Sequence, residues 1–543
     1  MPPVMTSREP SQPPGTVPLE DLQRNYSGVA IILQPTPSRN PNDPLNWKQW
    51  EKFINYGLVL LYSLLMFAVI GAATPTWAPM NEQLGFSYEI LNDSYATGSA
   101  TLCIGALIFI PVALKFGRRP IYLLSALLQV AICIWFAKVQ TIADLMLVNA
   151  LSCLLGALAE VIVQMTVADM FFVHQRGQMN SLYIWVMIIG SALAPLVAGY
   201  ITDSQGWRWV WWWMAILFGV CFVLFLFLYE ETKFVEWIDG SPPSNTTQEL
   251  NSTAQQRQGT GKEDYKDDLD IELAKVQSTT IHTCRPDLDL SILRTPYVRR
   301  LALWSTTPGS LGFFIRHIYQ PLVVTVAFPA VFYVAVLYGV ITATWQVMIT
   351  VIASVMPEAP YNFTASQIGL MSLAPLIGTT LGSLITGPLS DRLILWLAKR
   401  NGGLFEPEMR LWIVLAFAPL VPAGILLFGY SLGNGNSWII VAAGYAIFGL
   451  AMAPVSSASL TYLTDAYTNI VADSLVGVTF VRNLLATIFV FAITPWEAAV
   501  GLQSVFLALG VFMIAILGPG TLVFMYFGKQ LRAKTAERYR SYS

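Results

Sequence analysis

Residues 156–177 read GALAEVIVQMTVADMFFVHQRG, a mostly apolar run that contains Glu160, Gln164 and Asp169 and carries Arg176 near its end. An ionisable group inside a membrane-length helix costs about 2.5–3.5 kcal/mol on insertion scales, so its default interpretation is functional. Glu160 and Gln164 are four residues apart and share one helix face. In a membrane, this pair would line a cavity. Asp169 lies about two and a half turns beyond Glu160, on the opposite face and near a surface.

The composition indicates an integral membrane protein. Of the 543 residues, 55% are hydrophobic and only 12% are charged, whereas soluble proteins carry roughly 25% charged residues. The net charge of -2 shows no basic excess for nucleic acid. The five cysteines and three histidines form no metal-ligand or nucleophile pattern. We therefore expect no nucleic-acid partner, no cofactor, no metal and no enzymatic activity.

Apolar runs long enough to span a bilayer fall into two sets of six. The first set covers residues 53–80, 94–114, 120–137, 145–168, 178–202 and 209–229, and the second covers 319–356, 366–390, 411–430, 438–464, 474–496 and 498–527. Two equal sets around a hydrophilic stretch predict duplicated halves with a path between them. The predicted fold is all-α, with twelve transmembrane helices in two six-helix pseudo-repeats. Its parts are a tail (1–51), a first bundle (52–230), a central loop (231–317), a second bundle (318–528) and a tail (529–543).

The placement of lysine and arginine predicts the orientation. One set of connections holds most of these residues, together with both termini and the central loop, and the opposite set is mainly acidic. Cytosolic loops carry the excess of lysine and arginine, so both termini are expected in the cytosol. Two glycosylation sequons, at Asn92 and Asn362, would then face outward, although a sequon is a weak signal and unmodified asparagine is the expected state of both.

A short basic loop follows the second span and reads Gly117-Arg118-Arg119-Pro120. With the six-loop-six plan, it resembles the signature loop of the major facilitator superfamily. The phrases at 43–47 (DPLNW), 168–177 (ADMFFVHQRG) and 206–209 (GWRW) resemble a fungal twelve-span branch that includes drug:proton antiporters. The resemblance implies proton-driven alternating access around a site between the halves, without cofactors.

The sequence also departs from the family pattern. Leu114 occupies the place of the usual loop aspartate, whereas the second half keeps Gly387, Asp391 and Arg392. The span-five antiporter motif is softened to Gly190, Pro195 and Gly199, with alanine twice replacing glycine. The intramembrane arginine that many proton antiporters carry in span four is absent, and Asn149 and Ser152 lie in that region. Glu160 is then the residue left in this helix to carry protons.

Other candidate residues follow from position. Aromatic and amide side chains in spans that face the cavity in this family are candidates for substrate contact, although packing explains each one singly: Tyr62, Tyr183, Trp185, Tyr333, Trp345 and Gln346. Asp169, His174 and Arg176 form a candidate cytosolic latch, with a solvated helix end as the alternative. Arg482 interrupts the eleventh span and needs a partner, for which Asp465 or Asp473 are the candidates.

These patterns predict a secondary transporter of small organic molecules, using proton-coupled efflux of a drug-like compound or fungal secondary metabolite. The first alternative is proton-coupled uptake of a polyamine-like or other organic cation, for which the lone intramembrane glutamate is suited. A second alternative is a transporter-like membrane sensor that signals through the central loop. We expect a monomer in the lipid bilayer, in the plasma membrane rather than the vacuole.

Overall fold

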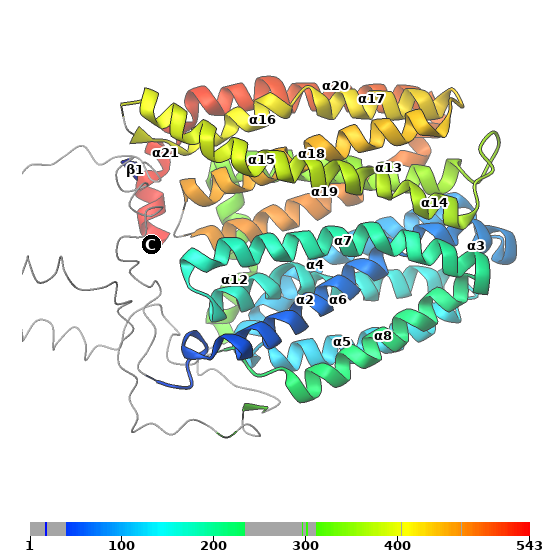
Figure 1. Cartoon of the computed structure of the whole chain (residues 1–543), viewed down its shortest axis with the longest axis horizontal. Coiled ribbons are helices and arrows are strands. Elements are labelled where there is room, and N and C mark those ends of the chain that lie inside the picture. The colour runs from blue at the N-terminus through cyan, green and yellow to red at the C-terminus, as the bar shows by residue number, and fades with distance from the viewer. Residues whose placement is uncertain are drawn as a thin grey trace, which may run out of the picture.

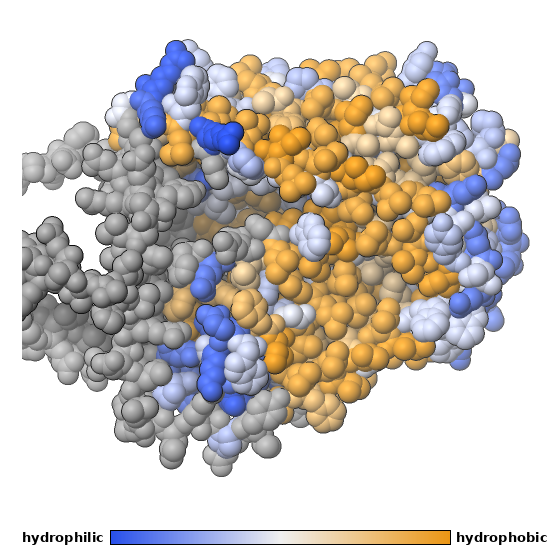
Figure 2. Space-filling view, viewed as in Figure 1, coloured by the Kyte–Doolittle hydropathy of each residue, from blue (hydrophilic) through white to orange (hydrophobic). Residues whose placement is uncertain are grey.

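The computed structural model describes residues 17–18, 40–233, 296, 300–301, 311–402, 404–467 and 470–542. Among these residues, 12 helices are long and apolar enough to cross a membrane, which confirms the predicted fold class. Most of the predicted N-terminal tail and central loop, including His282, lies outside the described residues. Figure 2 shows a broad apolar belt around the middle of the molecule, with hydrophilic residues gathered at its two ends.

The first half runs from η1 (Pro44–Asn46) to α8. Its spans are α2 (Gln49–Gly71) with its continuation through η2 (Thr74–Thr76) and α3 (Trp77–Leu84), then α4 (Tyr88–Phe116), α5 (Arg119–Ala137), α6 (Ile142–Met170), α7 (Val173–Gln205) and α8 (Trp207–Leu228). In the view of Figure 1, α2, α5, α6, α7 and α8 lie in the lower part of the molecule.

Most of the second half lies above it in Figure 1, whereas α12 reaches down beside the first half. Its helices are α12 (Leu311–Ala327), α13 (Pro329–Val355), α14 (Ala365–Met371), α15 (Leu373–Arg400), α16 (Leu411–Phe417), α17 (Leu420–Gly433), α18 (Trp438–Ala466), α19 (Val471–Val500), α20 (Leu502–Ala515) and α21 (Thr521–Tyr542). Short segments connect them: β2 (Leu404–Phe405), which pairs antiparallel with β1 (Val17–Pro18), η4 (Pro407–Arg410) and the π-helical η6 (Ile516–Gly520).

The expected single run over residues 319–356 is two helices. α12 ends at Ala327 and α13 begins at Pro329. A proline is tolerated in the first turn of a helix, where its missing N–H has no intrahelical partner, but it disfavours a helical conformation at the preceding residue. Phe328 accordingly has extended dihedral angles. Apolarity alone did not reveal this break.

Glycines with positive φ form equivalent turns in both halves. Gly206 (φ 95°) separates α7 from α8, and Gly501 (φ 79°) separates α19 from α20. Such backbone angles disfavour residues that carry a Cβ. The fifth and sixth helices of each half are therefore joined by the same device, as expected of a duplicated fold.

Each half packs around its own core. One cluster of buried side chains lies almost entirely within residues 58–229, and the other almost entirely within residues 324–539. The main contacts between halves are α4 with α19 and α7 with α14. Two separately packed bodies with a limited interface are suited to move relative to each other.

The two ends of the bundle differ in charge. We call the end that carries Arg118, Arg119, Arg410 and Arg532 the basic end, at the left of Figure 1 with α21 and the C-terminus. The acidic end carries Glu82, Asp203, Glu358 and Glu497 and lies at the right, with α3 and α14.

Candidate functional site

An ion pair joins the two halves between α6 and α19. The Arg482 guanidinium on α19 donates through Nη2 to Oε1 of Glu160 on α6. The Asn483 side-chain amide donates to Oε2 of Glu160 at 3.0 Å, and its oxygen accepts from Nε of Arg482 at 3.2 Å. The ring of Tyr338 lies 5.5 Å from the guanidinium carbon of Arg482, within cation–π range. Both carboxylate oxygens of Glu160 thus receive a donor from the other half.

This cluster is secluded from solvent. Glu160 is 6% exposed, Arg482 is 8% exposed and Asn483 is fully buried. A buried charge in an apolar medium requires a partner, and removal of one member of a buried pair typically costs about 3–5 kcal/mol. The partners come from different halves. If α6 and α19 separate, Glu160 and Arg482 must therefore each find another partner or lose their charge.

The expectation that Asp465 or Asp473 neutralises Arg482 is wrong. Asp465 pairs with Arg410 at the basic end. Asp473 accepts a hydrogen bond of 2.7 Å from the side-chain amide of Gln320. Asp473 lies nine residues before Arg482 on the same helix, which places it on the opposite face. The partner comes instead from α6 of the other half, through Glu160.

The other candidates for substrate contact surround this pair at several depths. Tyr183 is buried, and its hydroxyl donates to the carbonyl of Ala159 at 2.8 Å, next to Glu160. Gln164 is half-buried one turn closer to the basic end. Towards the acidic end, Gln346 on α13 accepts from Ser99 on α4 at 3.1 Å, a second polar contact between the halves.

Three aromatic candidates each pack against residues of their own half. Tyr62 is fully buried and bonded to Ser125, and Tyr333 stacks on Phe524, so packing, the alternative given for each of these candidates, describes these two. Both side chains face the core of their own half. The spacing of residues in a helix does not show which of its faces meets the cavity and which meets the core. Trp345 is half-buried beside Tyr445, at 5.5 Å between ring centroids.

The halves are in close backbone contact at the acidic end. A Cβ added at Gly199 on α7 would overlap the carbonyl of Ala365, and one at Gly369 would overlap the carbonyl of Pro195. Small residues at such sites let helices approach closely. The Ser366 amide also donates to Asp203 at 3.0 Å. The altered span-five motif therefore contributes Pro195 and Gly199 to this contact. Its third residue, Gly190, faces the carbonyl of Leu64 on α2 instead.

The same two helices diverge toward the basic end. Trp185 lies on the face of α7 that also carries Gly199, fourteen residues away, yet 54% of it is exposed. Gly387 lies on α15, eighteen residues beyond Gly369 of α14. Among the described residues, no atom lies within 4 Å of a Cβ added at Gly387. The contact between α7 and the second half is thus tight at the acidic end, whereas toward the basic end the described contacts between the halves include α12 with α4.

The glycosylation sequon at Asn92 lies in this closed interface. Asn92 is 4% exposed, and its amide donates to the carbonyl of Val490 on α19 at 2.6 Å. Because a glycan needs an accessible surface asparagine, the burial of Asn92 favours the unmodified state. Asn362 is exposed in the loop before α14 and stays a prediction.

The signature loop at the basic end is held by acidic residues. Arg118 pairs with Asp169 at 3.0 Å, between Nε and Oδ2. The two oxygens of Glu231 accept from the backbone amides of Arg118 and Arg119 at 3.0 and 3.1 Å. Gly117, with φ 95°, makes the tight turn. Asp169 thus joins Arg118; the side chains of His174 and Arg176, the other members of the predicted latch, lie outside the described residues.

The second half uses different residues at the corresponding place. Arg392 is exposed, and the side chain of Asp391 lies outside the described residues. The described ion pairs here are Arg410 with Asp465, Lys529 with Glu406 at 2.6 Å, and the buried pair of Arg532 with Glu408 at 2.6 Å. The basic ends of the two halves are therefore braced asymmetrically.

Sequence reasoning missed two members of these networks, Asn483 and Glu231. The adjacency of Asn483 to the intramembrane Arg482 was a usable signal, because a buried guanidinium needs several acceptors. Glu231 directly follows the sixth span, at the same end as the loop of Arg118 and Arg119. A carboxylate at that point is available to the free amides at the start of α5.

Known proteins resemble the chain over nearly its whole length. The family model of the Major Facilitator Superfamily matches residues 59–357. An uncharacterized MFS-type transporter of Schizosaccharomyces pombe is 31% identical, over 94% of this chain and 90% of that protein. Protein HOL1 of Saccharomyces cerevisiae is 29% identical, over 95% and 92%. Efflux pump radE of Floropilus chiversii is 25% identical, over 91% and 84%.

Solved structures agree in fold. The xylose transporter XylE from E. coli, in a partially occluded inward open conformation, has a TM-score of 0.55 at 13% identity, covering 88% of this chain and 98% of that chain. At this identity the likeness concerns the arrangement of helices alone.

Proposed function

Because the chain belongs to the Major Facilitator Superfamily and is a secondary transporter, we propose that it couples proton entry to export of a drug-like compound or secondary metabolite. The observation that carries this proposal is the buried pair of Glu160 and Arg482 across the two halves. It supplies one protonatable group in the moving interface. The residues of the site, and not the fold, carry the argument for the mechanism.

Proton binding to Glu160 would uncouple the pair. The neutral acid no longer compensates Arg482, and a charge left alone in this interface is costly. Protonation therefore favours separation of α6 from α19 and a rearrangement of the halves. Movement of one charge through 100 mV supplies about 2.3 kcal/mol, which is sufficient for modest accumulation. The proton and the substrate would then bind to the same site in turn.

The orientation follows from charge. We assign the basic end to the cytosol, because cytosolic connections carry the excess of lysine and arginine. The contact of Gly199 and Gly369 at the acidic end then closes the outer side, so an export substrate would enter from the cytosolic side. The name of the relative radE, an efflux pump, is consistent with this direction. The plasma-membrane location and the monomeric unit stay predictions.

The test is solute counterflow in proteoliposomes, with a panel of aromatic metabolites and organic cations. We expect Glu160→Gln to lose accumulation driven by a pH gradient and to keep passive exchange. Glu408→Gln is the matched control, because it removes a buried carboxylate that pairs with Arg532 within one half. Full gradient-driven transport by Glu160→Gln excludes this residue from coupling.

One observation favours the second candidate, uptake of an organic cation. A guanidinium already sits between the Glu160 carboxylate and the ring of Tyr338, so the site accepts a cationic group. A substrate cation would then displace Arg482. Inward transport stimulated by an acidic exterior, together with loss of affinity in Tyr338→Leu, would support this candidate over export.

A further inference from the structure

The first helix of the second half, α12, lies between the two halves at the basic end. It packs against α19 of its own half and against α4 of the first half. The side-chain amide of Gln320 on α12 donates to Asp473 on α19 at 2.7 Å. Thr325 on α12 lies against Gly477, where an added Cβ would overlap its hydroxyl oxygen. Both contacts are in the first two turns of α19, so α12 lies nearer the basic end than Arg482 does.

A break in the helix gives α12 a direction of its own. Phe328 has extended dihedral angles, and Pro329 begins α13. The ring of Phe328 is buried and meets the ring of Tyr467 edge-on, with 5.1 Å between the centroids, so the break is held within the second half. From this point α12 reaches down beside the first half, as Figure 1 shows. The helix therefore crosses from the second half toward the first at the basic end.

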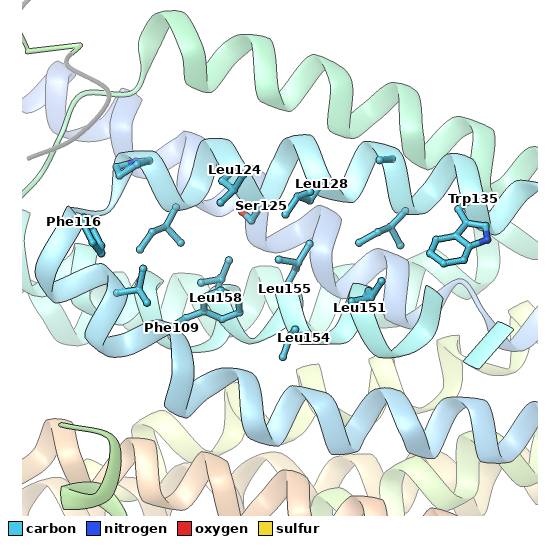
Figure 3. A pocket seen from close by; sticks show the side chains of 15 residues that line it. Phe109, Phe116, Leu124, Ser125, Leu128, Trp135, Leu151, Leu154, Leu155 and Leu158 are labelled. Atoms are coloured by element: carbon cyan, nitrogen blue, oxygen red, sulfur yellow. The ribbon is translucent and has the colours of Figure 1, made fainter. Parts of the chain in front are cut away.

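The facing helix, α4, bends toward its own half. Pro111 stands inside α4, where a proline removes a backbone hydrogen bond and bends the helix. Figure 3 shows the segment of α4 with Phe109 and Phe116 stepping across toward α5. The bend turns the basic end of α4 away from the second half, and α12 reaches across to α4 from the other side.

The chain that leads into α12 is fastened to the first half. Arg300 lies eleven residues before the start of α12. Its Nη1 is 2.7 Å from Oε2 of Glu230 and 3.9 Å from Oε1 of Glu51. Both carboxylates are buried, with 5% and 4% of their residues exposed. The carbonyl of Leu301 accepts from the Arg119 guanidinium. The chain around α12 is thus fixed to the first half on one side and to the second half on the other.

The two carboxylates that Arg300 meets are held in place by the backbone. The amide of Glu230 donates to Oδ1 of Asn55 on α2 at 2.7 Å, and the side-chain amide of Asn55 donates to the carbonyl of Glu51 at 2.9 Å. Oε2 of Glu51 accepts from the amide of Lys48 at 3.1 Å. Two buried carboxylates repel each other, and a guanidinium within reach of both offsets that repulsion. The first half therefore presents a preformed acceptor for Arg300.

We propose that α12 is the inner gate of this transporter and that Arg300 is the anchor that keeps the gate shut. With the anchor in place, α12 is held against α4 and covers the basic-end side of the interface between the halves. Release of Arg300 from Glu230 and Glu51 lets α12 move away from α4 together with α19. The gate controls access from the basic end for transport in either direction, and it does not depend on proton coupling through Glu160.

The experiment measures access of a membrane-impermeant maleimide from the basic-end side. The reporter is Val476→Cys, in a background without native cysteines. Val476 is half-buried on α19 and packs against a cluster of buried side chains from α4 and α6 of the first half. In sealed vesicles with the basic end outward, this cysteine becomes reactive when the halves separate there. We expect Arg300→Gln to raise the labelling rate about tenfold, between the effects of exposed and buried ion pairs, because the Arg300 side chain is 17% exposed.

Further variants assign the effect to the anchor. Glu230→Gln removes the charge on the other side of the contact and leaves the backbone bond to Asn55, so it should raise the rate as Arg300→Gln does. Arg300→Glu combined with Glu230→Arg exchanges the two charges and should return the rate toward that of the parent. Arg400→Gln is the matched control, because Arg400 is exposed at the same end and its described contact is the ring of Trp396 in the same half. We expect no change in the control.

Hydrogen exchange on the same proteins covers the case in which a variant is poorly folded. Residues 318–327 of α12 should exchange faster in Arg300→Gln than in the parent, whereas residues 329–355 of α13 should exchange at the same rate. Faster exchange in both helices would indicate general loosening and overturn the proposal. Equal labelling of the parent and Arg300→Gln would also overturn it. So would an equal rise in Arg400→Gln, because any loss of positive charge at this end would then suffice.

Discussion

Replacement of Glu160 by glutamine should favour the state that is open at the acidic end over the state that is closed there. Removal of one partner from a buried ion pair costs about 3–5 kcal/mol. Glutamine keeps an oxygen that accepts from Asn483, which returns about 1 kcal/mol. The net change of about 2–4 kcal/mol corresponds to roughly a 30- to 700-fold change in the equilibrium constant between the closed and open states, at about 1.4 kcal/mol per tenfold.

The assay is alkylation of a reporter cysteine at the closed contact. In a background without native cysteines, Ser372→Cys replaces a hydroxyl that donates to the carbonyl of Ala192 at 2.6 Å. A membrane-impermeant maleimide reaches this cysteine from the acidic side only when the halves separate there. We expect Glu160→Gln to raise the labelling rate by the factor above, until the open state predominates.

A double-mutant cycle identifies the cause. Glu160→Gln with Arg482→Gln leaves no buried charge, so the pair of changes should restore a rate close to that of the parent. Glu408→Gln should lower the Tm without raising the labelling rate, because its partner Arg532 belongs to the same half. A rate for Glu160→Gln within about twofold of the parent, which is the limit of additivity for independent sites, refutes the reasoning.

Three further predictions concern other parts of the chain. Gly199→Val, which places a side chain against a facing carbonyl, should destabilise the closed acidic end by about 1–3 kcal/mol and reduce transport, whereas Gly387→Ala should do neither; radiolabelled flux and Tm measure both. Burial, then the charge of Arg118, lowers the pKa of Lys233 to about 8. Between about pH 8 and its usual pKa, the unfolded chain binds a proton that the folded chain has lost, so stability should rise with pH in wild type more than in Lys233→Met. Asn362→Gln should remove any glycan-dependent mobility shift on gels, and a residual shift would point to another site.

The sequence determined the fold because the bilayer imposes its own lengths. A helix must supply about 20 apolar residues whatever its neighbours are, so twelve runs and two halves were recognisable without a structure. It also marked Glu160 and Arg482, because a charge in an apolar span is costly in every arrangement of the helices. They were the charges that interrupted the predicted fourth and eleventh spans, and this shared cost was a usable signal that they pair.

Only the tertiary structure decided which residues meet. Glu160 and Arg482 are 322 residues apart, and helical spacing gives the face of each side chain but not the helix that this face will meet. The same limit explains why Tyr62 and Tyr333 proved to be core residues and why Asn92 lies in an interface. Packing of α4 on α19 and of α7 on α14 fixes these choices, because contacts between halves depend on many small and shape-matched surfaces that no single run of sequence contains.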